Sequence, residues 1–382
     1  MGKSSKKSSS STTKTADAKE ERRSQRNKKA PPPLQRRSSR SKEFPFLPLG
    51  IVFGVFAIFL YIPYKRYGKN LFFPRADYQY GEEEWQSLMK DKKILLLGGP
   101  HRGGTSILWK SLKQHHDISG FGNTFETGVD ESEGILMQDV YPRFGIGNED
   151  FRTQHPGWST SSEGVGQYAL HPDVHMTEES GLITTKNRLK LWNRFGPHWN
   201  LTKPIWMEKS PPTIVMTRFL QAMYDDSSEK DDRTYFIILA RHPLATVLAT
   251  ENMMGKNYLS YDRVMMNYVK MYQYYLEDKS HLKNPPQLVK LEDFAKDPKE
   301  VLSKLVNWLE LDDATEWMDA ILPTIHSNPN AKYQKRWCQE EGLQSIRMAL
   351  ITKYQKVFTT ELAFLGYDLS TWCDGMGTSN EF

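Results

Sequence analysis

The sequence has little cysteine and no recognisable cluster of metal ligands. Two of its 382 residues are cysteine, Cys338 and Cys373, and neither these nor the 10 histidines stand at the spacing of a metal site. We therefore predict no bound metal. In an oxidising compartment the two cysteines can form a disulfide, but they can also stay as free thiols, and the sequence leaves both states open.

Most of the chain also lacks an excess of positive charge. Residues 1–43 hold 14 of the 51 Lys and Arg residues but 4 of the 46 Asp and Glu residues, so the net charge of +5 comes from this segment. The mildly acidic remainder argues against a nucleic-acid partner, which would require a basic face. Residues 1–43 are rich in Ser, Lys and Arg and have no apolar periodicity, which predicts a disordered basic tail.

Residues 44–64 contain no charged side chain. This run reaches the ~20 apolar residues that span a bilayer, so we predict a transmembrane signal-anchor helix that attaches the protein to a membrane. Lys and Arg are denser before the run than after it, which places the tail in the cytosol and the rest of the chain in a lumen. Residues 65–91 are then a stem or linker. Gly50 and Gly54 form the G-x-x-x-G pattern of helix dimers, and the sequence leaves two alternatives open, a homodimer through this helix or a chance occurrence of two glycines.

A glycine-rich segment lacks the lysine of a nucleotide-hydrolase loop. The apolar run 94–98 is followed by Gly103 and Thr105 at the spacing G-x-x-x-x-G-K-[ST], but Gly104 occupies the lysine position. Such a strand-to-helix turn presents backbone N–H groups to an anion. Because the lysine that clamps a triphosphate is missing, we expect a different phosphate-bearing donor, with Arg102 as the cation of the loop.

Strand-like and helix-like segments alternate from residue 93 onward, which predicts an α/β fold of the P-loop-like kind, with a mostly parallel sheet flanked by helices and preceded by the transmembrane helix. The expected strands are 93–97, 204–208, 235–240 and 287–291, and the expected helices are 105–114, 213–224, 244–254, 261–277 and 300–309. Asp297 and Pro298 predict the start of the last helix, as its N-cap and first residue. Residues 120–172 show no clear element, which is typical of a functional loop.

Four segments, in this order, resemble the PAPS-dependent sulfotransferase family in its Golgi-type, membrane-anchored form. The family signatures P-[RK]-S-G-T-T, E-K-[ST]-P, R-[DN]-P and Y-E-D-L-x-x-D-P correspond to residues 100–106, with one residue inserted, 208–211, 241–243 and 291–298. The resemblance covers residues 92–369, which we take as the sulfotransferase domain, with 370–382 as a C-terminal tail. It implies that PAPS (3′-phosphoadenylyl sulfate) is the donor and that no metal is used.

The resemblance also assigns roles to residues. The 5′-phosphosulfate of the donor would lie on the loop formed by Arg102, Gly103, Gly104, Thr105 and Ser106. Lys209 corresponds to the family lysine beside the transferring sulfonate, so Lys209 and Arg102 are candidate catalytic residues. Arg241 corresponds to the arginine that grips the 3′-phosphate, because a guanidinium matches a fork of oxygens.

Other parts of the site depart from the family pattern or leave alternatives open. The family serine eight residues after the arginine is replaced by Ala249, so we expect Thr250, or Thr246, to contact the 3′-phosphate. Lys335 and Arg336 would close over the same phosphate, although a solvated basic cluster explains them equally well.

The general base is assigned by position alone. It would remove the proton of the acceptor hydroxyl, a task that suits Glu or His. Membrane-bound relatives often carry a glutamate shortly after the first helix, and the carboxylates near that place are Glu126, Asp130, Glu131 and Glu133. Of these we favour Glu133 and then Glu131, against the alternative of a solvated acidic loop.

The sequence thus predicts a type II Golgi membrane enzyme that transfers sulfonate from PAPS to a hydroxyl of a glycan, a protein tyrosine or a small metabolite. Two other classes remain open. A P-loop kinase or nucleotide hydrolase would need the missing lysine and a metal-binding aspartate where Arg241 stands. A catalytically inactive, membrane-anchored nucleotide-binding protein is compatible with the departure at Ala249.

Overall fold

The computed structural model describes residues 80–121, 140, 165–170, 173–225, 232–256, 259–312 and 315–374. These residues belong to one compact unit. The predicted basic tail, the predicted membrane helix at 44–64 and the candidate bases Glu131 and Glu133 lie outside the described residues. Among the helices that are described, none has the length and hydrophobicity required to cross a membrane.

Five parallel strands form one sheet in the order β2-β3-β1-β4-β5. Their bounds are β1 Lys93–Gly98, β2 Ile118–Ser119, β3 Ile205–Lys209, β4 Thr234–Ala240 and β5 Gln287–Lys290. The predicted α/β class with a parallel sheet is confirmed. Because all five strands run in one direction, their carboxyl ends share one edge of the sheet, where open α/β sheets bind ligands.

The helices surround this sheet. Their bounds are α2 Glu82–Met89, α3 Thr105–Lys113, α5 Thr185–Phe195, α6 Thr217–Tyr224, α7 Pro243–Met254, α8 Tyr261–Asp278, α9 Leu291–Lys296, α10 Pro298–Trp308, α11 Thr315–Ile321, α12 Ala331–Gln339 and α13 Gln344–Thr359, with short 3-10 turns η3 Tyr168–Leu170 and η5 Pro211–Val215 among them. The helix expected at 213–224 begins as η5, since Pro211 and Pro212 open that turn and contribute no N–H groups.

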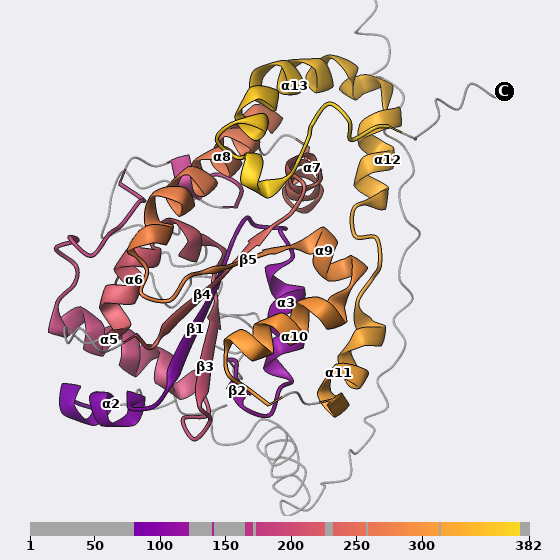
Figure 1. Cartoon of the computed structure of the whole chain (residues 1–382). Helices are drawn as coiled ribbons and strands as arrows, with labels where there is room; N and C mark the ends of the chain where they lie inside the picture. The colour runs from indigo at the N-terminus through magenta and orange to yellow at the C-terminus, as the bar shows by residue number, and fades with distance from the viewer. Residues whose placement is uncertain are drawn as a thin grey trace, which may run out of the picture. The chain divides into compact units, whose positions relative to one another are not determined.

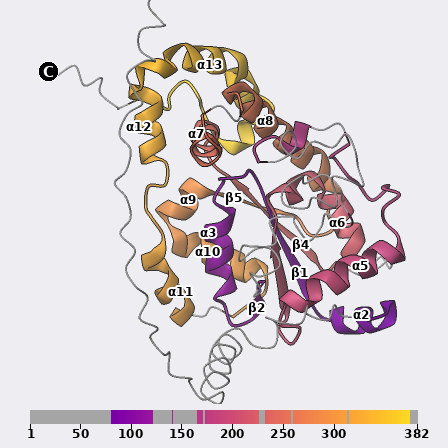
Figure 2. The ribbon, with the colours of Figure 1, turned by 180° about the vertical axis from the view of Figure 1, so that it is seen from behind.

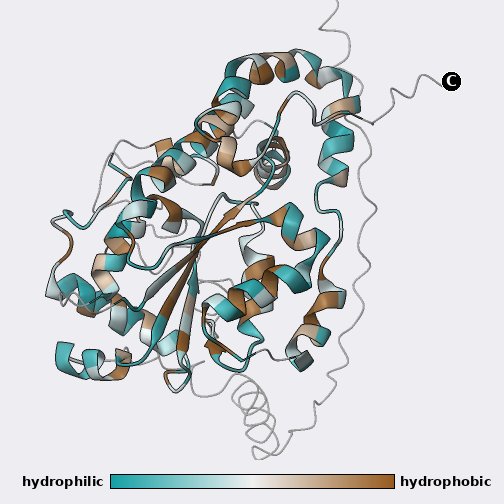
Figure 3. Cartoon of the chain, viewed as in Figure 1, coloured by the Kyte–Doolittle hydropathy of each residue, from teal (hydrophilic) through white to brown (hydrophobic). Residues whose placement is uncertain are grey.

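Alternate residues of each strand face two different cores. Ile94 and Leu96 of β1 pack with Trp206, whereas Leu95 and Leu97 pack on the opposite face. Helices α3, α9, α10 and α11 cover the second face, and α2, α5, α6 and α8 cover the first (Figures 1 and 2). The strands are accordingly hydrophobic, while the helices carry hydrophilic residues as well (Figure 3). Burial on both faces is the reason that the central strands β1 and β4 appear as continuous apolar runs in the sequence.

The folded part extends beyond both predicted boundaries. Helix α2 lies inside the segment predicted as a linker, and its Trp85 is fully buried, where its indole Nε1 donates to Asn193 Oδ1 at 3.0 Å. At the other end, Trp372 and Cys373 of the predicted tail pack against the core, and Cys373 forms a disulfide with Cys338. Both segments lie outside the predicted domain of residues 92–369, and a few apolar side chains are enough to attach each of them to the core.

Candidate functional site

The loops after β1, β3 and β4 meet at the carboxyl edge of the sheet. Leu97, near the end of β1, is paired with Lys209 at the end of β3 and with Ile237 of β4. Central strand β1 therefore places the glycine-rich loop between Lys209 on one side and the Arg241 turn after β4 on the other. The sheet order thus brings together the three segments that the sequence motifs had indicated.

Backbone constraints shape the glycine-rich loop. Gly99 has φ +139°, and a Cβ there would lie 2.6 Å from the carbonyl oxygen of Leu239. Gly104, the N-cap of α3, has φ +97°. Arg102 also has a left-handed φ of 64°, which is uncommon for a residue with a side chain and occurs preferentially at functional sites. The N–H of Gly103 donates to Pro100 O at 2.8 Å and closes the turn.

The loop leads directly into the N-terminus of α3, which begins with Thr105 and Ser106. Its N-cap, Gly104, offers no side chain to accept hydrogen bonds from the first-turn N–H groups. Such groups, together with the positive end of the helix dipole, favour an anion. Thr105 is buried and Ser106 half-buried, and both lie with Arg102, Gly103 and Gly104 in the turn that opens α3.

Lys209 is fully buried at the end of β3, beside the loop. Its neighbour Glu208 is equally buried and accepts a hydrogen bond from the hydroxyl of Ser210. Burial lowers the pKa of His101 in this loop, and the nearby charge of Lys209 lowers it further. A buried ammonium at the base of an anion loop can stabilise charge that shifts during group transfer.

His101 is a residue of the site that the sequence motifs did not single out. Burial is the main cause that lowers its pKa to about 3, and the charges of Lys209 and Arg102 act in the same direction. Its ring contacts Tyr168 edge to face, with centroids 5.3 Å apart. Among the described residues its Nδ1 atom has no hydrogen-bond partner although it is buried. The lowered pKa favours the neutral form of His101 at physiological pH.

Arg241 is held at three points. Its Nε donates to Asn330 Oδ1 at 2.9 Å, Nη1 to the carbonyl oxygen of Arg102 at 2.7 Å, and Nη2 to the carbonyl oxygen of Pro329 at 2.9 Å. The guanidinium also lies over the ring of Tyr333, 4.9 Å from its centroid. Burial lowers the pKa of Arg241, but an arginine stays protonated in proteins. Of its five N–H groups, two remain for a ligand within the described part of the chain.

Glu292 connects the parts of this site. It accepts hydrogen bonds from His242 N at 2.8 Å, Asn330 Nδ2 at 2.5 Å and the hydroxyl of Tyr367 at 2.8 Å. The sequence motif at 291–298 contained Glu292 but gave it no role. The structure shows that its carboxylate joins the turn after β4, the residue before α12 and the C-terminal segment.

The hydroxyls of Thr250 and Thr246 are engaged within α7. Thr250 is buried and donates to Thr246 O at 2.8 Å, and Thr246 donates to His242 O at 3.2 Å. Each oxygen keeps lone pairs but has already used its proton, and a phosphate requires donors. Contact of Thr250 with the 3′-phosphate remains a prediction and would require this hydroxyl to turn.

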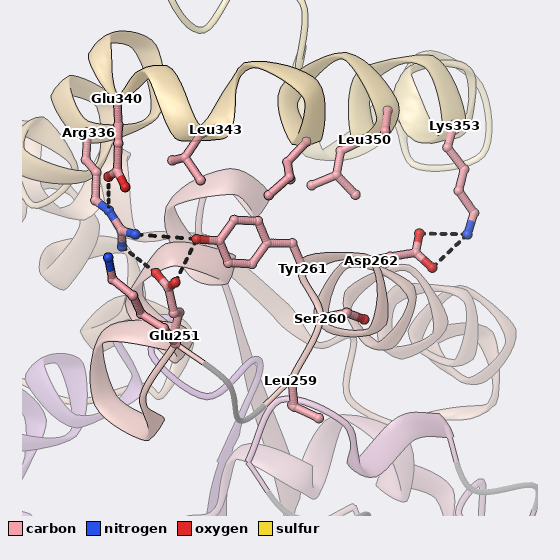
Figure 4. A pocket seen from close by; sticks show the side chains of 13 residues that line it. Glu251, Leu259, Ser260, Tyr261, Asp262, Arg336, Glu340, Leu343, Leu350 and Lys353 are labelled. Carbon is pink, nitrogen blue, oxygen red and sulfur yellow. Dashed lines mark hydrogen bonds and ion pairs between the residues drawn. The ribbon is translucent and has the colours of Figure 1, made fainter. Parts of the chain in front are cut away.

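The structure does not bring Arg336 to the three loops. Its guanidinium forms ion pairs with Glu251 at the end of α7 and with Glu340, at 2.7 Å for the second, and Nη2 donates to Tyr261 at 3.4 Å. These groups form one end of a cavity of about 560 Å³ between α7, α8, α12 and α13, which Figure 4 shows from close by. Lys335, the adjacent residue, is exposed. The guanidinium of Arg336 is thus bound to two carboxylates. Contact of Lys335 or Arg336 with the 3′-phosphate remains a prediction.

One group of potential metal ligands occurs in the described residues. His115, His116 and Asp117 place their ligand atoms within 4.8 Å of one another. However, His115 Nε2 lies 3.2 Å from the carbonyl oxygen of Asp312, and its Nδ1 accepts from the N–H of Asp117 at 3.1 Å. Both nitrogens of this ring are therefore hydrogen-bonded to the backbone. The three side chains lie close together because they are consecutive residues of one turn.

The chain belongs to the sulfotransferase family. The sequence model described as "Sulfotransferase family" matches residues 95–316, which is more than half of the chain. The protein is therefore an enzyme that transfers a sulfonate group. No curated protein sequence matches it significantly.

Among solved structures, the chain is similar to a sulfotransferase from Alicyclobacillus acidocaldarius, with 15% identity over 74% of this chain and 98% of that chain and a TM-score of 0.42. It is also similar to mouse sulfotransferase SULT7A1 complexed with PAP, with 12% identity over 75% and 94% of the two chains and a TM-score of 0.38. A third structure is the sulfotransferase domain of the Synechococcus PCC 7002 olefin synthase, with 16% identity over 63% and 82% and a TM-score of 0.33.

Proposed function

We propose that the sulfonate donor is PAPS and that it lies across the carboxyl edge of β3, β1 and β4. The observation that carries this proposal is the 2.7 Å hydrogen bond from Arg241 to the carbonyl oxygen of Arg102. It places a second cation at the rim of the anion loop, so that two anion-binding groups lie side by side. PAPS carries two separate anionic groups, the 5′-phosphosulfate and the 3′-phosphate, and these residue types suit both.

Each residue has a distinct task in this arrangement. The donor supplies the sulfonate, whose bond to the 5′-phosphate breaks as a bond to the acceptor oxygen forms. The N-terminus of α3 and the loop with Arg102 hold the 5′-phosphate in place. Lys209 lies where it stabilises the negative charge that grows on that phosphate. Arg241 binds the 3′-phosphate, which does not change, and thereby orients the donor.

We further propose that the enzyme is a type II membrane protein of the Golgi whose acceptor is a hydroxyl of a glycan, a protein tyrosine or a small metabolite. The uncharged run 44–64 and its basic flank support membrane anchoring. The disulfide between Cys338 and Cys373 supports an oxidising compartment. Asn200, in the sequon Asn200-Leu201-Thr202, is exposed and available for glycosylation. Glu133 or Glu131 remains our candidate for the base.

Thermal unfolding in the presence of nucleotides tests the donor. We expect PAP and PAPS to raise the melting temperature of the protein, since a ligand that binds the native state alone stabilises it. ATP with Mg²⁺ should stabilise it much less, because ATP has no 3′-phosphate and the loop has no lysine for a triphosphate. Equal stabilisation by Mg²⁺–ATP would contradict the proposal.

A second experiment identifies the acceptor class. The protein is incubated with labelled PAPS and with glycan, peptide and metabolite acceptors, and transfer of the label shows which of them is used. PAP binding without any turnover would indicate an inactive member of the family.

A further inference from the structure

The chain segment after α13 returns to the donor side of the sheet. The indole of Trp372 stacks on the imidazole of His242, with ring centroids 4.3 Å apart and an interplanar angle of 10°. Tyr367 contacts the same imidazole edge on, at 5.3 Å. His242 directly follows Arg241 in the chain, so two aromatic side chains from the C-terminal segment hold the turn that carries the Arg241 guanidinium. We refer to residues 367–373 as the C-terminal strap.

Helix α12 fastens the strap. Cys373 forms the disulfide with Cys338 of α12, and Gln334 Nε2 donates to the carbonyl oxygen of Trp372 at 2.6 Å. The same helix begins directly after Asn330, which accepts the hydrogen bond from Arg241 Nε, and it carries Tyr333 beneath the guanidinium. One helix therefore binds Arg241 through its first turn and binds the strap through its later residues.

Glu292 provides a second connection between the strap and the Arg241 turn. The hydroxyl of Tyr367 donates to one oxygen of this carboxylate, and Asn330 Nδ2 and the N–H of His242 donate to the other. The side chain of Asn330 thus lies between Arg241 and Glu292 and is fixed at both of its ends. Loss of the strap would remove one of the three donors to Glu292 and the ring that covers His242.

We propose that the C-terminal strap, fastened by the disulfide, is a positioning element for the donor. It acts through His242, Glu292 and Asn330 and keeps the guanidinium of Arg241 in the orientation that receives the 3′-phosphate. This inference rests on the proposed function, in which Arg241 binds that phosphate. Trp372 and Tyr367 are positioning residues, since they act on the donor through His242 and Glu292. Reduction of the disulfide to two thiols removes the covalent link between the strap and α12 and leaves the hydrogen bond from Gln334 to Trp372, so the affinity for the 3′-phosphate becomes sensitive to thiol reductants.

The test compares two ligands that differ in the 3′-phosphate. Isothermal calorimetry measures the affinity of the full-length protein for PAP and for AMP, which lacks that phosphate, before and after reduction by a dithiol. We expect reduction, or the double substitution Cys338→Ser and Cys373→Ser, to weaken PAP binding about tenfold, as for a misplaced charge-assisted hydrogen bond. AMP binding should change less than about twofold on the same scale, because the loop and the N-terminus of α3 are untouched.

A matched pair of variants keeps the disulfide intact. Trp372→Ala removes the ring that covers His242 and should lower the ratio of PAP to AMP affinity, whereas Trp372→Phe keeps a stacking ring and should preserve the ratio. A ratio that is unchanged by reduction and by Trp372→Ala would overturn the role of the strap. Equal losses for PAP and AMP would also overturn it, since they indicate general damage. If the oxidised wild type itself does not prefer PAP to AMP, the assignment of Arg241 fails first, which separates the two proposals.

Discussion

The buried histidines of the donor site make stability depend on pH. Burial lowers the pKa values of His101 and His242 to about 3, with further lowering from Lys209 and Arg102 at His101 and from Arg241 at His242. In the unfolded chain these rings titrate near their ordinary value of 6.5. Between pH 6.5 and about 3 the unfolded state therefore binds more protons, so stability falls as the pH falls through this range.

We expect each histidine to contribute up to about 1.4 kcal/mol of lost stability per pH unit in that window. His101→Gln and His242→Gln should each flatten the decline. Urea unfolding at pH 7 and pH 5 measures this, with the wild type as the reference for all other titrating groups. A variant whose stability changes with pH as steeply as that of the wild type would show that its histidine is accessible to protons in the folded state.

The two cations of the site should affect different kinetic constants. In the proposed function Lys209 faces charge that changes during transfer, so we expect Lys209→Met, which keeps most of the buried stem, to lower kcat on the order of 10²-fold. Arg241→Lys keeps the charge but loses the fork that contacts Asn330 and the carbonyl oxygens of Arg102 and Pro329. It should mainly raise the KM for PAPS, because the 3′-phosphate is bound equally before and during the reaction.

Steady-state kinetics at varied PAPS concentration separates these effects, and unchanged melting temperatures serve as the folding control. If the Lys209 variant keeps the kcat of the wild type, Lys209 is a structural residue and its assignment to the sulfonate is wrong. A fall in kcat alone for Arg241→Lys would likewise remove Arg241 from the 3′-phosphate.

At the scale of secondary structure, α2 shows that a short helix can be held to the core by very few apolar side chains, which are difficult to recognise in the sequence. It contains three glutamates in its first turn and buries just two side chains, Trp85 and Met89. Trp85→Ala should destabilise the protein by about 3–5 kcal/mol, the usual cost of truncating a fully buried large aromatic side chain. Ser87→Ala, at an exposed position of the same helix, is the control and should stay within about 0.5 kcal/mol of wild type. Equal stability of the two variants in denaturant unfolding would mean that α2 is not part of the cooperative unit.

The elements that the sequence predicted well are those with a strong local signal. Strands β1 and β4 contain the apolar runs 94–97 and 235–240, and β3 and β5 contain shorter ones. The start of α10 was indicated by its cap, since Asp297 Oδ1 accepts from Glu300 N at 2.9 Å. Strand β2 has two residues, too few for any pattern, and α12 buries two aromatic side chains, Tyr333 and Trp337, in an otherwise mostly polar segment. Their positions are set by partners that are distant in the chain.

The same distinction applies to the site. Motifs identified the loop with Arg102, and Lys209 and Arg241, because each follows a strand and carries a charge suited to an anion. Glu292, Asn330 and Trp372 were missed as members of the site, since their roles exist only through contacts between segments up to 130 residues apart. Arg336 is the opposite case. It was assigned to the site from its place near a family-like motif, and in the structure it forms an ion pair with Glu251.

At the scale of the whole molecule, topology is the property to test. With the run 44–64 as a signal anchor, we expect the chain after it to be lumenal and Asn200 to be glycosylated. Its exposure in the turn before β3 permits this. Expression in cells followed by glycosidase treatment should shift the mobility of the wild type, and Asn200→Gln should abolish the shift. Protease digestion of intact microsomes that removes the region after residue 70 would contradict both the orientation and the Golgi assignment.

The threefold attachment of Arg241 has a consequence for how fast the donor can bind. A mobile arginine on a protein surface loses rotational freedom about several bonds when it binds a phosphate, which costs roughly 0.5–1.5 kcal/mol for such a side chain. The side chain of Arg241 has already lost this freedom, because it donates hydrogen bonds to Asn330 and to two carbonyl oxygens. Its two remaining N–H groups therefore form a preorganised receptor. In the proposed function we therefore expect capture of the donor to need no side-chain rearrangement at this residue, so that access to the edge of the sheet limits its rate.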